Sequence, residues 1–263
     1  MQLMRLNASL HKISHIFISH LHGDHHLGLM GLLFSMHMNR RESDLHLYSF
    51  KGLDEIIVAQ LRYSQSNLHF KIVFHELHPE NEEIIFEDEA ISVTTIPLLH
   101  KIPCHGFLFR EKPKPRRIDK SKLTPGMLLQ HIAQLKTGSD VRTEAGDMLY
   151  KNVDFTLPPH PSVSYAYCSD TGYLPALAKT LRGVDLLYHE ATFMESEKSK
   201  ALETKHCTAA DAARVAMQAE VKQLVIGHFS ARYRDLEPLL AEAQAIFRNT
   251  ALATECTTFT INA

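Results

Sequence analysis

The chain has 263 residues, 44% of them hydrophobic, and a formal net charge of −2 at pH 7. This length and composition indicate one globular domain with a substantial core. They exclude a mini-domain and a protein that binds nucleic acid through overall positive charge. Four cysteines without Cys-x-x-Cys spacing favour reduced thiols, and neither a signal peptide nor a run of 18 apolar residues is present. We therefore expect a cytoplasmic protein that does not enter a membrane.

A cluster of candidate metal ligands follows the first strand-like run. His20, His22, Asp24 and His25 stand within six consecutive positions. In an extended segment, His20 and His22 project to the same side, so both can bind one ion. Gly23 allows a sharp turn, after which Asp24 and His25 can reach a second ion. The cluster predicts a metal site, with two metals expected; the alternative is a polar loop in which histidines happen to gather.

Beyond this cluster, strand-like and helix-like segments alternate, which is the pattern of a layered α/β fold. Short runs rich in β-branched and aromatic residues predict core strands. Thr208 followed by Asp211 resembles a capping box and predicts that a helix begins after Thr208. The predicted strands cover residues 16–18, 91–96, 163–168, 184–188 and 224–227, and the predicted helices cover residues 25–39, 53–64, 208–219 and 235–247.

Four of the predicted strands lead directly to polar side chains, and these are His100, Asp170, Glu190 and His228. Ligands at successive strand ends would converge on one edge of a layered fold. A single such residue is more often a hydrogen-bonded core residue, so the repetition carries the prediction. His26 points about 100° away from His25 on a helix, and we expect it to face outward.

Charge is distributed unevenly along the chain. Residues 110–122 hold seven basic and two acidic side chains, whereas residues 76–89 hold seven acidic ones and no Lys or Arg. A basic run is ordinarily a solvated loop. Here Pro113 and Pro115 stiffen the run, and turn residues surround a helical piece within residues 123–141. The alternative is therefore a basic element that recognises phosphate.

Several motifs together resemble a known family. The cluster at residues 20–25, His100, the turn at residues 169–171 and the Gly-His pair at residues 227–228 resemble the ligand motifs of the metallo-β-lactamase superfamily. The stretches 189–192, 206–208 and 227–233 narrow the resemblance to the ribonuclease Z family, whose members trim the 3′ end of transfer RNA precursors. This resemblance implies an α/β protein with a four-layer αβ/βα sandwich. It also implies one domain over residues 1–263 that includes a protruding, substrate-binding arm at about 110–147.

The resemblance also implies a set of metal ligands. One metal takes His20, His22 and His100, the other takes Asp24, His25 and His228, and Asp170 bridges the two. A site rich in imidazole and bridged by a carboxylate suits two Zn²⁺ ions, with manganese and iron as alternatives. Two such metals would polarise the scissile phosphate and stabilise the charge of an in-line displacement.

Further residues receive roles from the same resemblance. Asp24 would also orient and deprotonate the attacking water. His206, oriented by Glu190, would protonate the departing 3′ oxygen; a structural hydrogen bond between the two is the alternative. The residues implied to hold substrate phosphate oxygens are Thr208, Ser230 and Arg232.

The implied partner is precursor transfer RNA, and the family also implies a homodimer. In this family the arm clamps the elbow of transfer RNA. A basic, proline-stiffened arm suits recognition of the phosphate backbone by charge and shape. The arm residues expected to contact RNA are Lys112, Lys114, Arg116 and Arg117.

The main departure from the family pattern is at the start of the chain. Family members open with several strands and a glycine-rich turn containing Asp, before the helix that leads into the histidine cluster. Here Leu3, Leu6 and Leu10 share one helical face, so the chain begins at what reads as the tail of that helix. We expect a chain that is truncated by roughly the first fifty residues, because a complete fold without central strands would have unpaired edges and an open core.

Milder departures are Ser169, Cys207 and Ala231, none of which removes a ligand. Two alternative functions stand beside a zinc-dependent endoribonuclease. One is another hydrolase of the superfamily, such as a phosphodiesterase or an arylsulfatase-like enzyme that acts on small esters, which the basic run argues against. The other is an inactive, truncated RNA-binding fragment.

Overall fold

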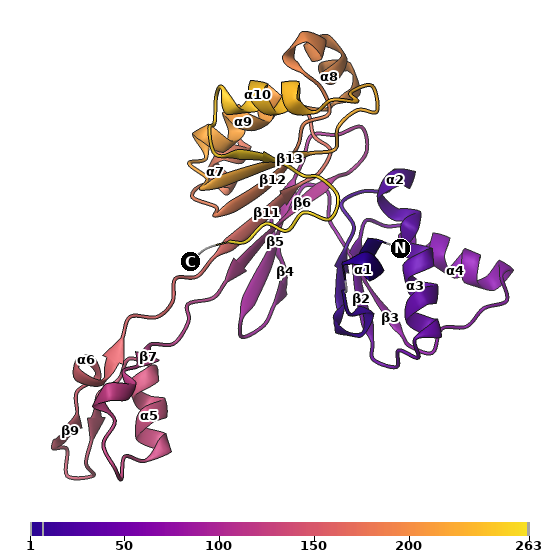
Figure 1. Ribbon diagram of the computed structural model, residues 1–263. Helices are drawn as coiled ribbons and strands as arrows, with labels where there is room; N and C mark the ends of the chain where they lie inside the picture. Colours follow the sequence, from indigo (N-terminus) through magenta and orange to yellow (C-terminus); the bar gives the residue numbers. More distant parts are fainter. Residues whose placement is uncertain (1, 7, 262–263) are drawn as a thin grey trace.

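Two β-sheets face each other and carry helices on their outer sides, and a separate arm extends from the larger sheet (Figure 1). The computed structural model describes residues 2–6 and 8–261. Within this part of the chain, no helix has the length and apolar character needed to cross a bilayer. The layered α/β architecture predicted from the alternation of strand-like and helix-like segments is confirmed.

The smaller sheet has three parallel strands in the order β1-β2-β3. Parallel neighbours require crossover connections, and α3 and α4 provide them on the outer face. Leu33 and Met36 of α3 and Ile57 of α4 are buried there against Leu45 and Leu47 of β2. The elements of this half are α1 (Gln2–Arg5), η1 (Leu10–Lys12), β1 (His15–Phe17), α2 (Gly23–His26), α3 (Gly28–Met38), β2 (Leu45–Ser49), α4 (Leu53–Tyr63) and β3 (Ile72–Glu76).

The larger sheet has seven strands in the order β14-β13-β12-β11-β6-β5-β4, of which β11 to β14 are parallel. Its outer face is covered by α7, α9 and α10 (Figure 1). Buried alanines such as Ala212 and Ala216 let α9 lie close to the sheet. The elements are β4 (Ile84–Glu87), β5 (Ile91–Pro97), β6 (His105–Glu111), β11 (Ser164–Cys168), α7 (Leu177–Thr180), β12 (Leu186–Glu190), η3 (Glu195–Glu197), α8 (Lys198–Thr204), α9 (Ala209–Gln218), β13 (Gln223–Gly227), α10 (Glu237–Gln244) and β14 (Thr250–Leu252).

An aromatic core joins the two sheets. Phe17 of β1 stacks on Tyr48 of β2 with ring centroids 4.7 Å apart, and it meets Phe107 of β6 at 5.4 Å. Tyr48, Phe107 and Val93 are almost fully buried in the same cluster. Burial of such large apolar surfaces stabilises the packing of the two sheets against each other.

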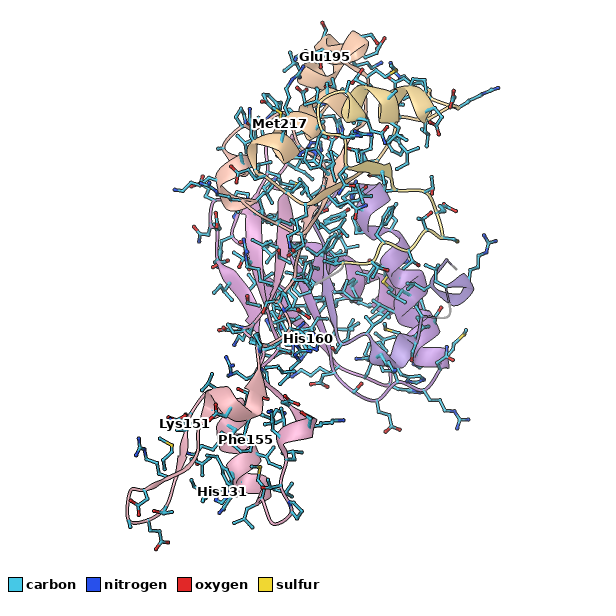
Figure 2. All side chains as sticks on the ribbon, turned by 60° about the vertical axis from the view of Figure 1, so that its left-hand side comes forward. His131, Lys151, Phe155, His160, Glu195 and Met217 are labelled. Atoms are coloured by element: carbon cyan, nitrogen blue, oxygen red, sulfur yellow. The ribbon has the colours of Figure 1, made fainter. Side chains whose placement is uncertain are left out.

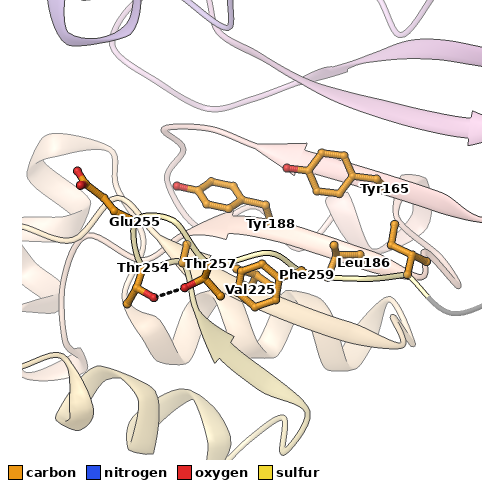
Figure 3. Close-up of a pocket in the computed structure, with 10 residues that line it drawn as sticks. Tyr165, Leu186, Tyr188, Val225, Thr254, Glu255, Thr257 and Phe259 are labelled. Atoms are coloured by element: carbon orange, nitrogen blue, oxygen red, sulfur yellow. Dashed lines mark hydrogen bonds between the residues drawn. The ribbon is translucent and has the colours of Figure 1, made fainter. Parts of the chain in front are cut away.

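The C-terminal segment, residues 253–261, runs across the face of the larger sheet. It lines an open pocket of about 570 Å³ together with Tyr165, Tyr188 and Val225. Figure 3 shows the two tyrosine rings on one side and Phe259 on the other. A 2.6 Å hydrogen bond between the hydroxyl groups of Thr254 and Thr257 folds the segment back at this point.

The arm comprises residues 112–163 and lies apart from the sheets (Figures 1 and 2). Its stem is a two-stranded antiparallel ribbon, in which β10 returns beside β7. Buried Leu135 and Val141 form a small core, and Asn152 donates its side-chain N–H to the carbonyl of Leu135. The arm elements are β7 (Arg117–Ile118), η2 (Lys120–Lys122), α5 (Leu129–Lys136), β8 (Val141–Arg142), β9 (Met148–Tyr150), α6 (Asn152–Phe155) and β10 (Thr156–Leu157).

Most predicted elements are present, and four details differ from the prediction. All five predicted strands occur within two residues of their expected positions, and helix 25–39 is divided into α2 and α3 at Leu27. The arm extends beyond the predicted limit of 147, because β10 pairs with β7. The helix α1 ends at Arg5 and Leu10 lies in η1, so the predicted shared helical face is wrong; Met1 lies outside the described residues. His26 is only 9% exposed and does not face outward.

Candidate metal centre and active site

The histidine cluster begins where β1 leaves the smaller sheet. The backbone N–H of Ile18 donates to the carbonyl of Tyr48 at 2.9 Å, which keeps the chain extended up to the fully buried His20. His22 is the N-cap residue of α2, so His25 follows on the first turn of this helix. The short segment 18–22, between β1 and α2, thus directs the cluster toward one point.

The predicted ligands converge in space. His20, His22, His100 and Asp170 form one group whose candidate ligand atoms all lie within 4.8 Å of one another. Asp24, His25 and His228 form a second group by the same measure. These are the two ligand sets that the family resemblance implied, and they come from strand ends and loops far apart in sequence.

Asp170 lies between the two groups. Its Oδ2 atom is 3.6 Å from His20 Nε2 and 3.3 Å from His25 Nε2, and its Oδ1 atom is 3.4 Å from His228 Nε2. His100 Nε2 is 3.8 Å from Oδ2. Oδ2 therefore lies near ligands of both groups, and Oδ1 lies near His228 of the second group.

The buried atoms of the cluster fit bound cations. His20 Nε2 and Asp170 Oδ1 are buried and make no hydrogen bond with residues 2–6 or 8–261. Burial of a polar atom without a partner lowers the stability of a fold, and a bound ion would provide such a partner. Imidazole nitrogens and carboxylate oxygens are ligands that zinc accepts, and residues of this kind fit a divalent metal.

The charge states of the cluster also suit metal binding, which requires neutral imidazole and ionised carboxylate. Burial, reinforced by the neighbouring His25, lowers the pKa of His20 to about 3. Burial alone would raise the pKa of Asp170, but the hydrogen bond and charge of His25 and the charge of His228 outweigh it and hold that pKa well below its usual range. His20 is thus neutral and Asp170 ionised at physiological pH.

Neighbouring groups orient the ligand rings. His20 Nδ1 lies 3.0 Å from the hydroxyl of Ser19, and His228 Nδ1 lies 2.9 Å from that of Thr192. A hydrogen bond to one ring nitrogen fixes the orientation of the ring and directs the other nitrogen toward a metal. The sequence motifs contained Thr192, but its contact with a ligand 36 residues away could not be predicted from spacing.

Glu190 and His206 form a hydrogen-bonded pair beside the metal ligands. His206 Nδ1 lies 2.8 Å from Oε1 of the fully buried Glu190, and the His206 ring stacks on His228 with centroids 5.4 Å apart. A short parallel bridge between Phe193 and Thr208 holds the two chain segments side by side. Burial alone would lower the pKa of His206, but the hydrogen bond to Glu190 outweighs it and raises that pKa.

Thr208 does not have the exposure that phosphate binding requires. It is fully buried, its hydroxyl donates to Glu195 at 2.8 Å, and the same oxygen accepts from the N–H of Asp211 at 3.1 Å. The capping box predicted from Thr208 and Asp211 is therefore confirmed. Because the cap uses this hydroxyl, the phosphate contact expected of Thr208 is wrong.

Ser230 and Arg232 lie beyond His228 on the surface of the site. Arg232 Nε donates to Ser230 Oγ at 3.2 Å, and Arg232 Nη1 forms a 2.8 Å ion pair with Glu197. The guanidinium also lies 5.1 Å from the centre of the Phe193 ring. A solvent-exposed ion pair contributes only about 0–1 kcal/mol to stability. A phosphate can therefore replace Glu197 as the partner of Arg232.

The four basic residues singled out in the arm lie at its stem and have partners on the body or the returning strand. Lys112 pairs with Glu87 at 2.9 Å, which joins the basic run to the acidic run. Lys114 pairs with Glu111 at 2.6 Å. Arg116 Nε donates to Thr156 Oγ1 at 2.7 Å, and Arg117 Nε donates to the carbonyl of Pro158 at 2.9 Å. The positive excess of the arm is thus at its base, since residues 118–163 hold five basic and five acidic side chains.

The strand end that carries His228 depends on Gly227. A Cβ atom at Gly227 would lie 2.5 Å from Tyr188 Oη and 2.7 Å from Tyr188 Cε2. We expect Gly227→Ala to lower the free energy of unfolding by about 1–3 kcal/mol, the usual cost of overpacking, in urea unfolding experiments. Gly31→Ala is the control, because nothing lies within 4 Å of its added Cβ in α3 and alanine favours a helix. Equal stability of Gly227→Ala and the wild type would contradict the packing argument.

The fold and the converging ligands define a member of the metallo-β-lactamase superfamily. A family model described as "Beta-lactamase superfamily domain" matches residues 2–131. Ribonuclease Z of Bacteroides fragilis is 48% identical over 256 residues, which cover 97% of this chain and 84% of that protein. Ribonuclease Z of Cytophaga hutchinsonii is also 48% identical, over 91% of this chain and 77% of that protein. The chain therefore belongs to the ribonuclease Z family, and it is a ribonuclease Z-type enzyme.

A solved structure supports the same family. The short form of human tRNase Z superposes with a TM-score of 0.69 at 25% sequence identity. The superposition covers 99% of this chain and 84% of the human chain. The fold class that the resemblance implied is confirmed.

Proposed function

We propose that this enzyme is a metal-dependent endoribonuclease that removes 3′ trailers from transfer RNA precursors, with two divalent ions per chain. The observation that carries the proposal is the pair of ligand groups around Asp170, directly beside the Glu190–His206 pair. Among the described residues, several buried ligand atoms of these groups make no hydrogen bond. Zinc is the ion we infer first from the imidazole-rich ligands, and manganese and iron are the alternatives.

Two bound ions would supply Lewis-acid activation of water and of the scissile phosphate. We infer that His20, His22 and His100 hold one ion, that Asp24, His25 and His228 hold the other, and that Asp170 bridges them. Asp24 has a 70% exposed side chain, so its carboxylate can also accept a proton from the attacking water. Ser230 and Arg232 would hold the phosphate oxygens, with Arg232 exchanging Glu197 for substrate.

The departing 3′ oxygen needs a proton when the phosphodiester bond breaks. His206 is the donor we infer, since the hydrogen bond to Glu190 raises its pKa and so favours the protonated ring. Glu190 also accepts from the backbone N–H of Thr171 at 3.1 Å and from the hydroxyl of Thr192 at 2.8 Å. These contacts hold the carboxylate still and thereby orient His206.

We infer that the arm binds precursor transfer RNA. Lys112 and Lys114 can contact the phosphate backbone after exchange of their carboxylate partners, since exposed ion pairs are weak. Arg116 and Arg117 donate to the neutral groups of Thr156 and Pro158, so their charge also remains available to attract phosphate. The part of the arm beyond the stem, whose basic and acidic side chains balance, would then contribute shape more than charge. From the family we also infer a homodimer in the cytoplasm, and light scattering should give twice the mass of one chain.

Deletion of the arm should separate substrate binding from chemistry. The Ser162 hydroxyl donates to the Lys112 carbonyl at 2.8 Å, so a short Gly-Ser linker can replace residues 113–161. We expect this deletion to weaken binding of precursor transfer RNA strongly and to leave hydrolysis of a small chromogenic phosphodiester nearly intact. Equal loss on both substrates would mean that the segment supports the fold instead.

Charge neutralisation provides a finer version of the same test. Replacement of Lys112, Lys114, Arg116 and Arg117 by Gln should flatten the salt dependence of binding, because each lost phosphate contact lowers the slope by about one. Lys71→Gln, directly before β3 of the smaller sheet, is the control and should keep the wild-type slope. An unchanged slope in the fourfold variant would exclude the stem as the phosphate contact.

Cleavage assays test the proposed function itself. The purified chain with zinc should release the 3′ trailer of a precursor transfer RNA and should cleave it faster than a small phosphodiester or an aryl sulfate. Preference for either small ester would favour another hydrolase of the superfamily. Binding of RNA without any cleavage would indicate an inactive RNA-binding fragment.

A further inference from the structure

Lys205 contacts the proposed metal ligand His100 through both its backbone and its side chain. The Nδ1 atom of His100 lies 3.0 Å from the carbonyl oxygen of Lys205. The ammonium of Lys205 donates to the carbonyl oxygen of His100 at 3.1 Å. A single residue 105 positions away in sequence thus holds both the ring and the backbone of this ligand.

The backbone of Lys205 adopts an unusual conformation to make these contacts. Lys205 ends α8 with φ 55° and ψ 54°, in the left-handed region. This conformation is strained for a residue with a side chain, and glycine is the usual residue at such a position. A strained residue of this kind that lies against a functional side chain points to a role in the site.

The contact determines which nitrogen of His100 can bind a cation. Since the carbonyl of Lys205 accepts a hydrogen bond, Nδ1 carries the proton and the lone pair is on Nε2. His100 Nε2 then lies 3.1 Å from His22 Nδ1 and 3.8 Å from Asp170 Oδ2. His100 comes from the loop between β5 and β6, so its orientation depends on contacts of this kind.

The same turn also carries His206. This residue follows Lys205 directly, and its ring centroid lies 5.1 Å from that of His100. The end of α8 thus positions a ligand of one metal and the inferred proton donor together.

We propose that Lys205 is a positioning residue, which fixes the ring orientation of His100 through its carbonyl and holds the loop of His100 through its ammonium. The inference rests on the proposed metal centre. In this role Lys205 keeps His100 oriented for metal binding and makes no direct contact with substrate.

Zinc affinity measured by competition with a chromophoric chelator tests this inference. Lys205→Met removes the ammonium and keeps the carbonyl, and we expect it to weaken zinc binding about 10-fold, the lower end for loss of a group that orients a ligand. Lys205→Arg should retain most of the affinity. Lys200→Met, an exposed position on the same helix, should bind zinc like the wild type.

Thermal unfolding of the metal-free proteins distinguishes positioning from helix capping. For Lys205→Met we expect the Tm of the metal-free protein to change by less than about 2 °C. A lower Tm with unchanged zinc affinity would overturn the inference, because Lys205 would then only cap α8. A wild-type chain that binds no zinc would instead overturn the proposed metal centre, and this inference with it.

Discussion

Asp170→Ala is expected to remove most of the bound metal and to lower cleavage of precursor transfer RNA more than about 100-fold. Loss of a group that only orients a ligand already costs 10- to 100-fold, and Asp170 faces both ligand groups directly. Metal analysis of the purified variant and a trailer-release assay measure the two effects. Glu203→Ala, an exposed carboxylate on α8, is the control and should retain metal and activity.

The bridging role that we infer for Asp170 predicts how many metal ions the variant loses. Both ions should be weakened in Asp170→Ala, since Oδ2 faces His20 of the first ligand group and Oδ1 faces His228 of the second. Two tightly held zinc ions per chain in this variant would refute the bridge. Loss of one ion alone would assign Asp170 to a single metal.

His206→Ala is expected to lower the turnover rate by ~10²–10⁴, the usual range for a lost proton donor, with metal content and RNA affinity largely kept. The defect should shrink on a substrate whose leaving group has a low pKa, because such a group departs without protonation. Single-turnover rates on a natural precursor and on an activated phosphodiester give the comparison.

Glu190 should act through His206 and not independently. Glu190→Gln should show a smaller version of the same defect, and the double variant should be little worse than His206→Ala if the two residues act as one unit. Loss of metal in His206→Ala, or equal slowing on both leaving groups, would mean that His206 is scaffold and not the donor.

Local patterns predicted much of the candidate ligand cluster, because its first members obey simple geometry. His20 and His22 are two residues apart after a strand, and the structure brings them together with His100 and Asp170 as expected of ligands at strand ends. The same logic of short apolar runs located the five predicted strands. The pairing of Glu190 with His206 came from family resemblance, since nothing in their spacing indicates contact.

What the sequence could not predict depends on contacts between distant segments. Lys205 meets His100 across 105 positions, and Thr192 meets His228 across 36. The limit of the arm was misjudged because β10 has two residues, too few to form a recognisable pattern, and its pairing with β7 alone defines it. The family resemblance predicts that Thr208 binds phosphate, but its hydroxyl is buried and donates to Glu195, a contact that the sequence does not reveal.

Titration of the metal-free chain with zinc, followed by trailer release from a precursor transfer RNA, tests the central claim most directly. The protein is stripped with a chelator, zinc is added in steps, and the initial rate is measured at each step. We predict no cleavage without metal and a rate that reaches its plateau at two zinc ions per chain. Full activity in the stripped protein, or a plateau at one ion per chain, would contradict the two-metal account.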